Sequence, residues 1–185
     1  MANETDALSS DGRTSLIQRE GLVRYYYNDT VNNCTYGVGT LAHLGPCTGQ
    51  ELHTHLTDDQ LGAGLQHGID RAESVVRQNV TQQNLTQPQF DALVSFVYNV
   101  GSRGAHQVLR QVNAGHLDGA AQEMSLHVHA TVRGPDRRPL RDAHGRVIKR
   151  ILHGLVRRRA EETGPFRAQQ APGGDSAAPA APTAE

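Results

Sequence analysis

The spacing of apolar residues along the chain predicts helices over most of its length. Between Thr57 and Val80 the apolar residues fall on one helical face, behind a Thr-Asp-Asp-Gln capping box. A second box, Thr86 to Gln89, has a proline in its first turn and leads into a broader apolar stripe. This stripe predicts the most buried helix, ending at Gly101. Further helices are expected over residues 14–23, 108–112, 118–128 and 147–162.

The segment from Tyr25 to Leu44 follows a different pattern. Its β-branched and aromatic residues are interrupted by Asn-Asp and Asn-Asn pairs and by glycines, which predicts short strands joined by tight turns. One helix, a small β-ribbon and a run of helices, with no internal repeat, indicate an α+β fold. A cleft is expected where the ribbon meets the helical body.

Both ends of the 185-residue chain differ in composition from the rest. Residues 1–13 are mostly polar and are predicted to be flexible. At the other end, Ala168 to Glu185 has no Leu, Ile, Val or aromatic residue and cannot bury enough apolar surface to offset the entropy of ordering. We therefore expect one domain over residues 14–166, followed by a disordered Ala/Pro-rich tail over residues 167–185.

Positive charge is concentrated towards the C-terminus, although the net charge of the chain is −1. Between Arg133 and Arg159, ten lysines or arginines stand against only two acids, Asp136 and Asp142. Such a segment is either a solvated surface or a face that meets an anionic polymer, such as cell wall, lipopolysaccharide or nucleic acid. It has no aromatic residue for base stacking and no nucleic-acid-binding motif, so we expect no nucleic-acid partner.

The sequence also indicates where the protein is made. No apolar run approaches the roughly 18 residues of a membrane span. The N-terminus lacks the basic-then-apolar layout of a signal peptide. We therefore expect a protein that is made in the cytoplasm and does not insert stably into a membrane.

Cysteines and histidines give little indication of a cofactor. Cys34 and Cys47 enclose twelve residues, and they are either a disulfide that closes a small loop or two free thiols. The His-x-His pairs at 53–55 and 127–129 lack a third ligand at a spacing typical of zinc sites, so we expect no metal. With no Gly-rich phosphate loop and no Gly-x-Ser-x-Gly elbow, no cofactor is expected.

Two acids near the start of the chain are the candidate catalytic groups. Glu20 ends the first predicted helix, Asp29 follows nine residues later at the start of the ribbon, and Thr35 lies six residues further on. Cleavage of a glycosidic bond needs one carboxyl group that donates a proton and one carboxylate that guides water or stabilises positive charge. By spacing alone, the two acids are equally well interpreted as a surface glutamate and a turn-forming aspartate.

Three segments, in the same order, resemble the phage-type lysozymes (glycoside hydrolase family 24). The first runs from Glu20-Gly21 through Asp29 and Thr35 to the Gly-x-Gly that ends at Gly39. The second, residues 89–101, is similar to the family's central helix, and the third, residues 154–161, to its closing Gly-Leu-x-x-Arg-Arg-x-x-Glu helix. The resemblance covers residues 14–166 and implies a lysozyme-like fold with the active-site cleft between a β-ribbon lobe and a mainly helical lobe.

The resemblance implies a muramidase, which cuts the β-1,4 bond between N-acetylmuramic acid and N-acetylglucosamine in peptidoglycan. Glu20 is similar to the family's general acid, Asp29 to the carboxylate that positions or activates water, and Thr35 to the hydroxyl that helps to hold this water. The family is expected to invert the anomeric centre, with about 6.5–9.5 Å between the carboxyl groups. The resemblance further implies substrate binding by Asn99, Tyr98 and Tyr36, and support of Glu20 by Arg157 or Arg158.

The sequence departs from the family pattern in three places. Thr40 stands where the family usually has a histidine, and residues 134–145 form a longer stretch that we expect to be an added hairpin. The pair Cys34 and Cys47 is not a general family feature. Because the implied function operates in an oxidising compartment, we favour a disulfide, which would make activity sensitive to reduction.

Two functions other than a muramidase are alternatives for this chain. A lytic transglycosylase would keep Glu20 but would need neither Asp29 nor Thr35, because a hydroxyl of the sugar itself attacks. A non-catalytic basic protein that binds cell wall or membrane would act without Glu20. A muramidase would serve as an endolysin released through a holin, or as an antibacterial effector injected into the periplasm by a secretion system. An effector would need an inhibitor or immunity protein, and we expect a monomer in either case.

Overall fold

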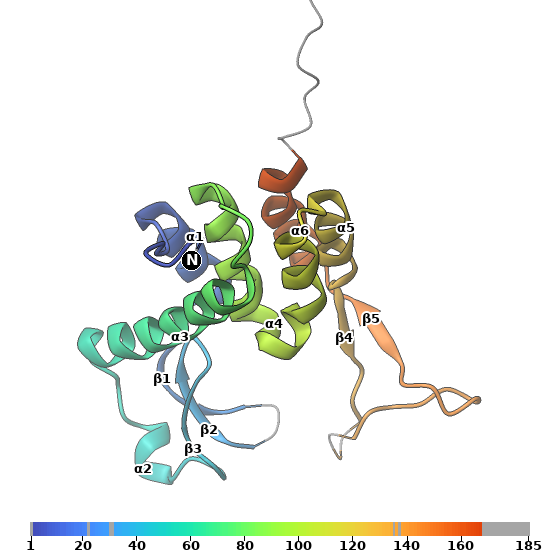
Figure 1. Cartoon of the computed structure of the whole chain (residues 1–185). Coiled ribbons are helices and arrows are strands. Elements are labelled where there is room, and N and C mark those ends of the chain that lie inside the picture. Colours follow the sequence, from blue (N-terminus) through green and yellow to red (C-terminus); the bar gives the residue numbers. More distant parts are fainter. Residues whose placement is uncertain (1, 22, 30–31, 135, 137, 168–185) are drawn as a thin grey trace, which may run out of the picture.

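The fold predicted from the sequence is confirmed. The computed structural model describes residues 2–21, 23–29, 32–134, 136 and 138–167. It combines a small three-stranded sheet, a helical body and a two-stranded arm (Figure 1). The elements are α1 (Ser10–Glu20), β1 (Val23–Asn28), β2 (Cys34–Gly37), β3 (Thr40–His43), α2 (Gly49–Leu52), α3 (Asp58–Asn79), α4 (Gln87–Asn113), α5 (Leu117–Leu126), β4 (His129–Thr131), β5 (Lys149–Ile151) and α6 (His153–Arg167).

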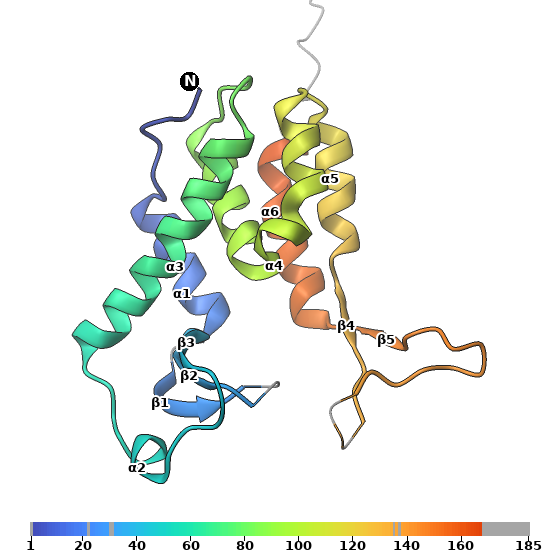
Figure 2. The same cartoon turned by 60° about the horizontal axis from the view of Figure 1, so that its bottom comes forward.

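The ribbon predicted between Tyr25 and Leu44 is present as the antiparallel sheet β1-β2-β3. Its register sets Tyr27 opposite Thr35. The sheet and α2 form a lobe below α1 and α3, and α3 runs from this lobe to the helical body (Figure 2). Asp29, which follows β1, and Thr35 on β2 are therefore held in one lobe, beside the end of α1.

The helical body is built around α4. The side chains of Phe90, Leu93 and Phe96 are fully buried, as the broad apolar stripe predicted. Both capping boxes, at Thr57 and Thr86, are formed. Packing against α3, α5 and α6 completes the core. No helix in the described part of the chain is both long and apolar enough to cross a membrane.

Gly101, where this helix was predicted to end, interrupts α4 instead. Its φ of 73° and ψ of 170° are not helical, and the helix resumes after it and runs to Asn113. A left-handed φ favours glycine because it has no Cβ. The predicted helix over 108–112 is the end of this second, longer segment.

The described part of residues 1–13, which were predicted to be flexible, contacts the helical body. Asn3 is 8% exposed, and its side chain donates to the carbonyls of Val80 (2.9 Å) and Gln83 (2.8 Å) and accepts from the amide of Leu85 (2.9 Å). The first helix also begins earlier than predicted, at Ser10, because Ser9 caps it. Hydrophobic periodicity missed these contacts because polar side chains make them.

The last helix was also placed wrongly at its start. Residues 147–152 were predicted as helical, but Lys149–Ile151 form β5, which pairs with β4. The helix α6 begins at His153 and extends to Arg167. Residues 147–152 place two basic residues between two apolar pairs, a pattern without the period of a strand, and the non-local pairing with β4 overrides the helical interpretation. The tail predicted over 167–185 lies outside the described residues except for Arg167, which ends α6.

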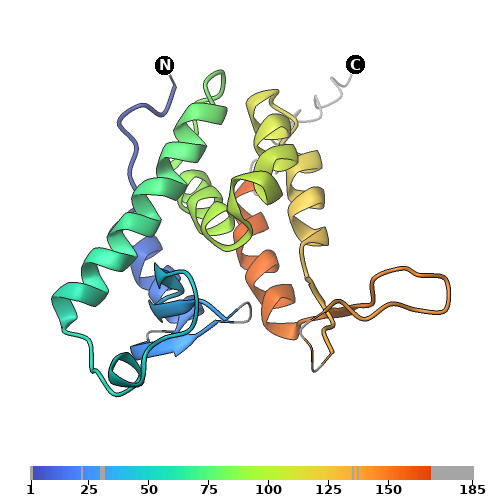
Figure 3. The same ribbon diagram turned by 90° about the horizontal axis from the view of Figure 1, so that it is seen from below.

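The added hairpin expected over residues 134–145 is part of a larger, forked arm (residues 129–151, of which 135 and 137 are not described). The strands β4 and β5 form its stem, and isolated bridges pair Arg133 with Pro139 and Arg141 with Val147. At the fork, three backbone hydrogen bonds of 2.8–2.9 Å form a ring: Val132 donates to Ile148, Ile148 to Leu140, and Leu140 to Val132. Two short prongs therefore leave one stem: residues 141–147 form one, and the described residues 133, 134, 136, 138 and 139 belong to the other (Figures 1 and 3).

Candidate active site

Glu20 lies at the C-terminal end of α1, where two hollows in the surface meet. Gly21, with a φ of 69°, ends the helix at this point. The α1–α6 hollow, about 950 Å³, is lined by α1, the start of α6 and the end of the arm. The α3–α4 hollow, about 540 Å³, is lined by α3, α4 and the β2–β3 turn. Glu20 and Asn99 line both hollows, so the predicted acid lies where the two lobes face each other.

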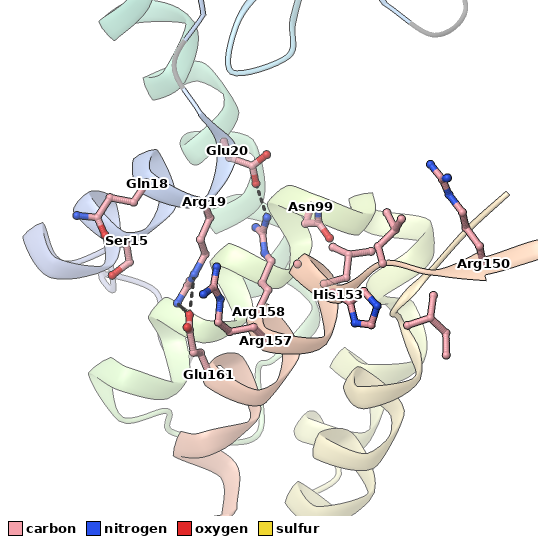
Figure 4. Close-up of a pocket in the computed structure, with 14 residues that line it drawn as sticks. Ser15, Gln18, Arg19, Glu20, Asn99, Arg150, His153, Arg157, Arg158 and Glu161 are labelled. Atoms are coloured by element: carbon pink, nitrogen blue, oxygen red, sulfur yellow. Dashed lines mark hydrogen bonds and ion pairs between the residues drawn. The ribbon is translucent and has the colours of Figure 1, made fainter. Parts of the chain in front are cut away.

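Arg158 fixes one oxygen of Glu20. Its Nη1 donates to Glu20 Oε1 over 2.6 Å, while its Nε donates to Glu162 over 2.8 Å and its Nη2 to the carbonyl of Ser95 over 2.9 Å. The side chain of Arg158 is 7% exposed and that of Glu20 is 18% exposed. Because the guanidinium group is held on three sides, it positions the Glu20 carboxyl group in a fixed place (Figure 4).

Glu162 is the centre of this buried network, and sequence analysis missed it. Its carboxylate pairs with both Arg158 and Arg159 and also accepts from the Ser95 hydroxyl over 2.6 Å. The sequence comparison stopped at Glu161, which is half exposed and pairs with Arg19 instead. Glu162 lies four residues after Arg158 and three after Arg159, so helical spacing was the signal that could have identified it.

The structure also distinguishes the arginines. Arg158, not Arg157, contacts Glu20; Arg157 is exposed and lines the α1–α6 hollow. Arg159 is buried, lies 4.7 Å from the centre of the Phe96 ring and donates to Asn99 Oδ1. The Asn99 amide is thereby oriented with its oxygen towards Arg159, which leaves its NH₂ group as the donor available at the cleft.

Asp29 and Thr35 lie on neighbouring segments of the β lobe. The carboxylate of Asp29 accepts the amide of Asn33 over 2.8 Å, which closes the turn between β1 and β2. Thr35 is 4% exposed, and its hydroxyl lies 3.4 Å from the carbonyl of Asn33. Asn33 thus connects the two side chains that were predicted to hold water.

Tyr27 is a further residue of the site that sequence analysis did not identify. It pairs across the sheet with Thr35. Burial raises the pKa of the Tyr27 hydroxyl, and the negative charges of Asp29 and Glu20 raise it further. Tyr27 therefore lies within electrostatic range of both candidate catalytic acids. A tyrosine among three consecutive tyrosines, 25–27, gave no signal of this position.

Of the two tyrosines predicted to bind substrate, only Tyr98 lines a hollow in the described residues. Burial, followed by the charge of Glu20, raises the pKa of Tyr98 to about 12. Its ring lies against Gly68, where an added Cβ would come within 2.6 Å of Tyr98 Cε2. Tyr36 instead packs on Tyr26, with 5.5 Å between ring centres, and approaches Gly64 on α3. Tyr36 lines neither hollow.

The two cysteines are joined in a disulfide, Cys34–Cys47, with 4.5 Å between their Cα atoms. Cys34, His43 and Glu51 have possible ligand atoms within 4.8 Å of one another. A disulfide sulfur cannot supply the thiolate that a metal would need. His43 pairs with Glu51 over 3.0 Å, and its hydrogen bond with the carbonyl of Leu44 raises its pKa, followed by the bond with Glu51. This group is therefore a surface cross-link of the β3–α2 connection.

Reduction of the disulfide is expected to lower the free energy of unfolding by about 2–3 kcal/mol, since it releases a short closed loop. Cys34 is fully buried and directly precedes Thr35, so activity is expected to fall as well. Thermal unfolding and activity should be measured with and without dithiothreitol. The double variant Cys34→Ala/Cys47→Ala should show the same loss without reductant and no response to it; a response of this variant would mean that the reductant acts elsewhere.

Comparison with known proteins identifies the family. A model of the phage lysozyme family matches residues 17–162. The chain belongs to the phage lysozyme family. It is 32% identical over 127 residues to the endolysin of Salmonella phage P22, an alignment that covers 64% of the chain and 82% of that relative. Sequence and structure therefore agree on the resemblance recognised from the three motifs.

Solved structures agree with this assignment to the phage lysozymes. The endolysin from Escherichia coli O157:H7 phage FAHEc1 is 26% identical, with a TM-score of 0.67, over 89% of the chain and 96% of the endolysin. The muramidase domain of SpmX from Asticaccaulis excentricus is 29% identical, with a TM-score of 0.66, over 86% of the chain and 97% of the domain. The lysozyme-like fold is thus confirmed across almost the full length of both structures.

Proposed function

We propose that the protein is a muramidase, a glycoside hydrolase that cuts peptidoglycan between N-acetylmuramic acid and N-acetylglucosamine. The observation that carries this proposal is the placement of Glu20. It lies at the junction of two hollows, and Arg158 fixes one of its oxygens. Family membership and the relatives named endolysin and muramidase support the same function.

Glu20 is the proton donor in this proposal. Arg158 binds Oε1, and the other carboxyl oxygen is turned away from Arg158 (Figure 4). A proton on this second oxygen can be transferred to the oxygen of the leaving sugar without breaking the contact with Arg158. The leaving sugar then departs as a neutral alcohol, and positive charge develops at the anomeric carbon.

Asp29 and Thr35 act on the attacking water. The Asp29 carboxylate accepts a proton from water, and the Thr35 hydroxyl orients it, so that oxygen attacks the face opposite the leaving group and inverts the anomeric centre. Asn33 holds both residues in the β lobe, while Glu20 belongs to α1. The two carboxyl groups therefore reach the bond from different elements.

Asn99 and Tyr98 bind the sugar. The NH₂ group of Asn99 is the donor left available after Arg159 occupies its oxygen, and sugar hydroxyls and N-acetyl carbonyls are acceptors for it. Tyr98 offers a ring face and a hydroxyl that stays protonated in the physiological range. Tyr36 has a packing role in this proposal, since it lies against Tyr26.

Product analysis tests this function. Purified peptidoglycan is incubated with the protein, and the released fragments are identified by mass spectrometry. A muramidase yields N-acetylmuramic acid with a reducing end. Fragments lighter by one water, with anhydro ends, would show a lytic transglycosylase and contradict the roles of Asp29 and Thr35. Absence of cleavage by the oxidised protein would leave only a binding function.

We further propose that the protein acts on the cell wall outside the cytoplasm, as a monomer, either as an endolysin or as an injected effector. The disulfide favours an oxidising compartment. In this proposal an endolysin would be released through a holin, whereas an effector would be injected by a secretion system and would need an inhibitor in the producing cell.

A further inference from the structure

The forked arm carries a strong excess of positive charge, although the chain as a whole has a net charge of −1. Its only acids are Asp136 and Asp142. Each is paired within its own prong, Asp136 with Arg138 at 3.8 Å and Asp142 with Arg146 at 2.9 Å. The described lysines and arginines of the arm are Arg133, Arg138, Arg141, Arg146, Lys149 and Arg150.

These cations face solvent rather than the protein. The side chains of Arg138 and Arg146 are 87% and 76% exposed. Lys149 and Arg150 are also exposed, and neither side chain has a hydrogen-bond or ion-pair partner among the described residues. The arm extends away from the helical body (Figures 2 and 3). The exposed side chains of Lys149 and Arg150 are therefore available to a partner.

The positive charge continues from the arm into the hollow that contains Glu20. Four arginines line the α1–α6 hollow, together with two glutamates. Glu20 is paired with Arg158 and Glu161 with Arg19. The remaining two, Arg150 at the end of the arm and Arg157 on α6, have no partner in the described part of the chain and lie in the same hollow (Figure 4).

We propose that the forked arm is a second binding element for the polymeric substrate, and that it recognises carboxylates of the acidic peptides attached to the glycan strands. This inference rests on the proposed function, since peptidoglycan supplies the carboxylates. An unpaired arginine in the hollow faces the strand being cut, and the prongs, which lie further out, face neighbouring strands. Guanidinium groups suit carboxylates because they donate two parallel hydrogen bonds.

Two other anionic partners fit the arm less well. The described residues of the prong tips, Gly134, Asp136 and Arg138 on one prong and 142–146 on the other, include no large apolar side chain to insert into a lipid bilayer. The aliphatic residues Val132, Leu140 and Ile148 lie at the fork, where their backbones pair. No Phe, Tyr or Trp occurs between 129 and 151, so the arm lacks the large aromatic rings on which nucleic-acid bases usually stack.

Binding to intact peptidoglycan sacculi tests the arm. All proteins carry Glu20→Gln, so that the polymer is not consumed, and binding is measured by pelleting over a range of salt concentrations. The arm variant is Arg138→Glu/Lys149→Glu. Its matched control, Arg103→Glu/Arg110→Glu, makes the same change in charge at exposed positions of α4. Circular dichroism and thermal unfolding establish that both variants are folded.

We expect the arm variant to bind sacculi about tenfold more weakly at low salt, with the difference shrinking as salt screens the charges. The α4 control should stay within about twofold of the parent, because its charges are not directed at the polymer. Sacculi whose carboxylates have been amidated should bind the parent as weakly as they bind the arm variant.

Three results would overturn the proposal: equal binding of the arm variant and the parent, an equal loss in the α4 control, or undiminished binding of the parent to amidated sacculi. Vesicles containing phosphatidylglycerol are included as a further probe. Arm-dependent pelleting with vesicles but not with sacculi would instead assign the arm to lipid. The binding assay requires no cleavage, so a negative result would contradict the role of the arm and not the muramidase function. The muramidase function is tested separately, by product analysis of the unmutated protein.

Discussion

Glu20→Gln is expected to lower the rate of peptidoglycan cleavage by a factor on the order of 10³. Glutamine has nearly the same shape and can still accept the hydrogen bond that Arg158 donates to Glu20 Oε1. It cannot donate a proton to the leaving oxygen. The loss should therefore appear in turnover rather than in substrate binding or thermal stability. Release of soluble fragments from labelled peptidoglycan measures it.

Glu161→Gln is the matched control for this experiment. Glu161 lines the same hollow and is ion-paired with Arg19 at 2.8 Å, but it is 50% exposed and does not contact Arg158. We expect Glu161→Gln to cleave peptidoglycan at a rate within about threefold of the parent's. Exposed ion pairs contribute about 1 kcal/mol or less to stability, so the site should remain intact. Substantial activity in Glu20→Gln, or an equal loss in Glu161→Gln, would be inconsistent with Glu20 as the proton donor.

Glu162→Gln is expected to lower the free energy of unfolding by about 3–5 kcal/mol. Glu162 is fully buried between Arg158 and Arg159, whose side chains are 7% and 2% exposed. Glutamine leaves Arg159 buried without an acidic partner among the described residues and leaves Arg158 with Glu20 alone, so that the desolvation of the two cations is no longer offset. Because Arg158 also loses one of the groups that hold it, the Glu20 carboxyl group should become less well positioned, and turnover should fall.

Urea unfolding of the parent, Glu162→Gln and Glu161→Gln measures this effect. Glu162 and Glu161 are adjacent in sequence, but their side chains are 0% and 50% exposed, respectively. Glu161→Gln should therefore lower the free energy of unfolding by at most about 1 kcal/mol. If the two variants unfolded at the same urea concentration with equal slopes, the network around Glu162 would not be a determinant of stability.

Sequence patterns predicted the elements whose signals are local. The capping boxes at Thr57 and Thr86 begin helices because their hydrogen bonds involve residues three apart. Gly101 breaks α4 because its own backbone is non-helical. The β-ribbon was also predicted from its local composition and turns. The three lysozyme-like motifs matched Glu20, Asp29 and Thr35 to positions of the family pattern.

Features that depend on distant contacts were missed. The buried position of Asn3 depends on carbonyls some 77 to 80 residues away, which no local pattern reports. The fork arises where the backbones of Val132, Leu140 and Ile148 pair in a ring. Hydrophobic periodicity does not report such pairing, and the residues from 147 onwards were therefore predicted as the start of a helix. Tyr27 belongs to the site only through its register with Thr35. Glu162 alone could have been identified, from its helical spacing to two arginines.

The stem of the arm has a consequence for how such enzymes diversify. His129 and Ile151 are paired across the stem, so the chain leaves the helical body and returns to it at adjacent points. Insertions or deletions between them can lengthen, shorten or recharge the arm without moving α5 or α6, and hence without displacing Arg158. The arm can therefore be grafted or exchanged as a unit, and selection for different bacterial walls can act on it while the proton donor and its support remain unchanged.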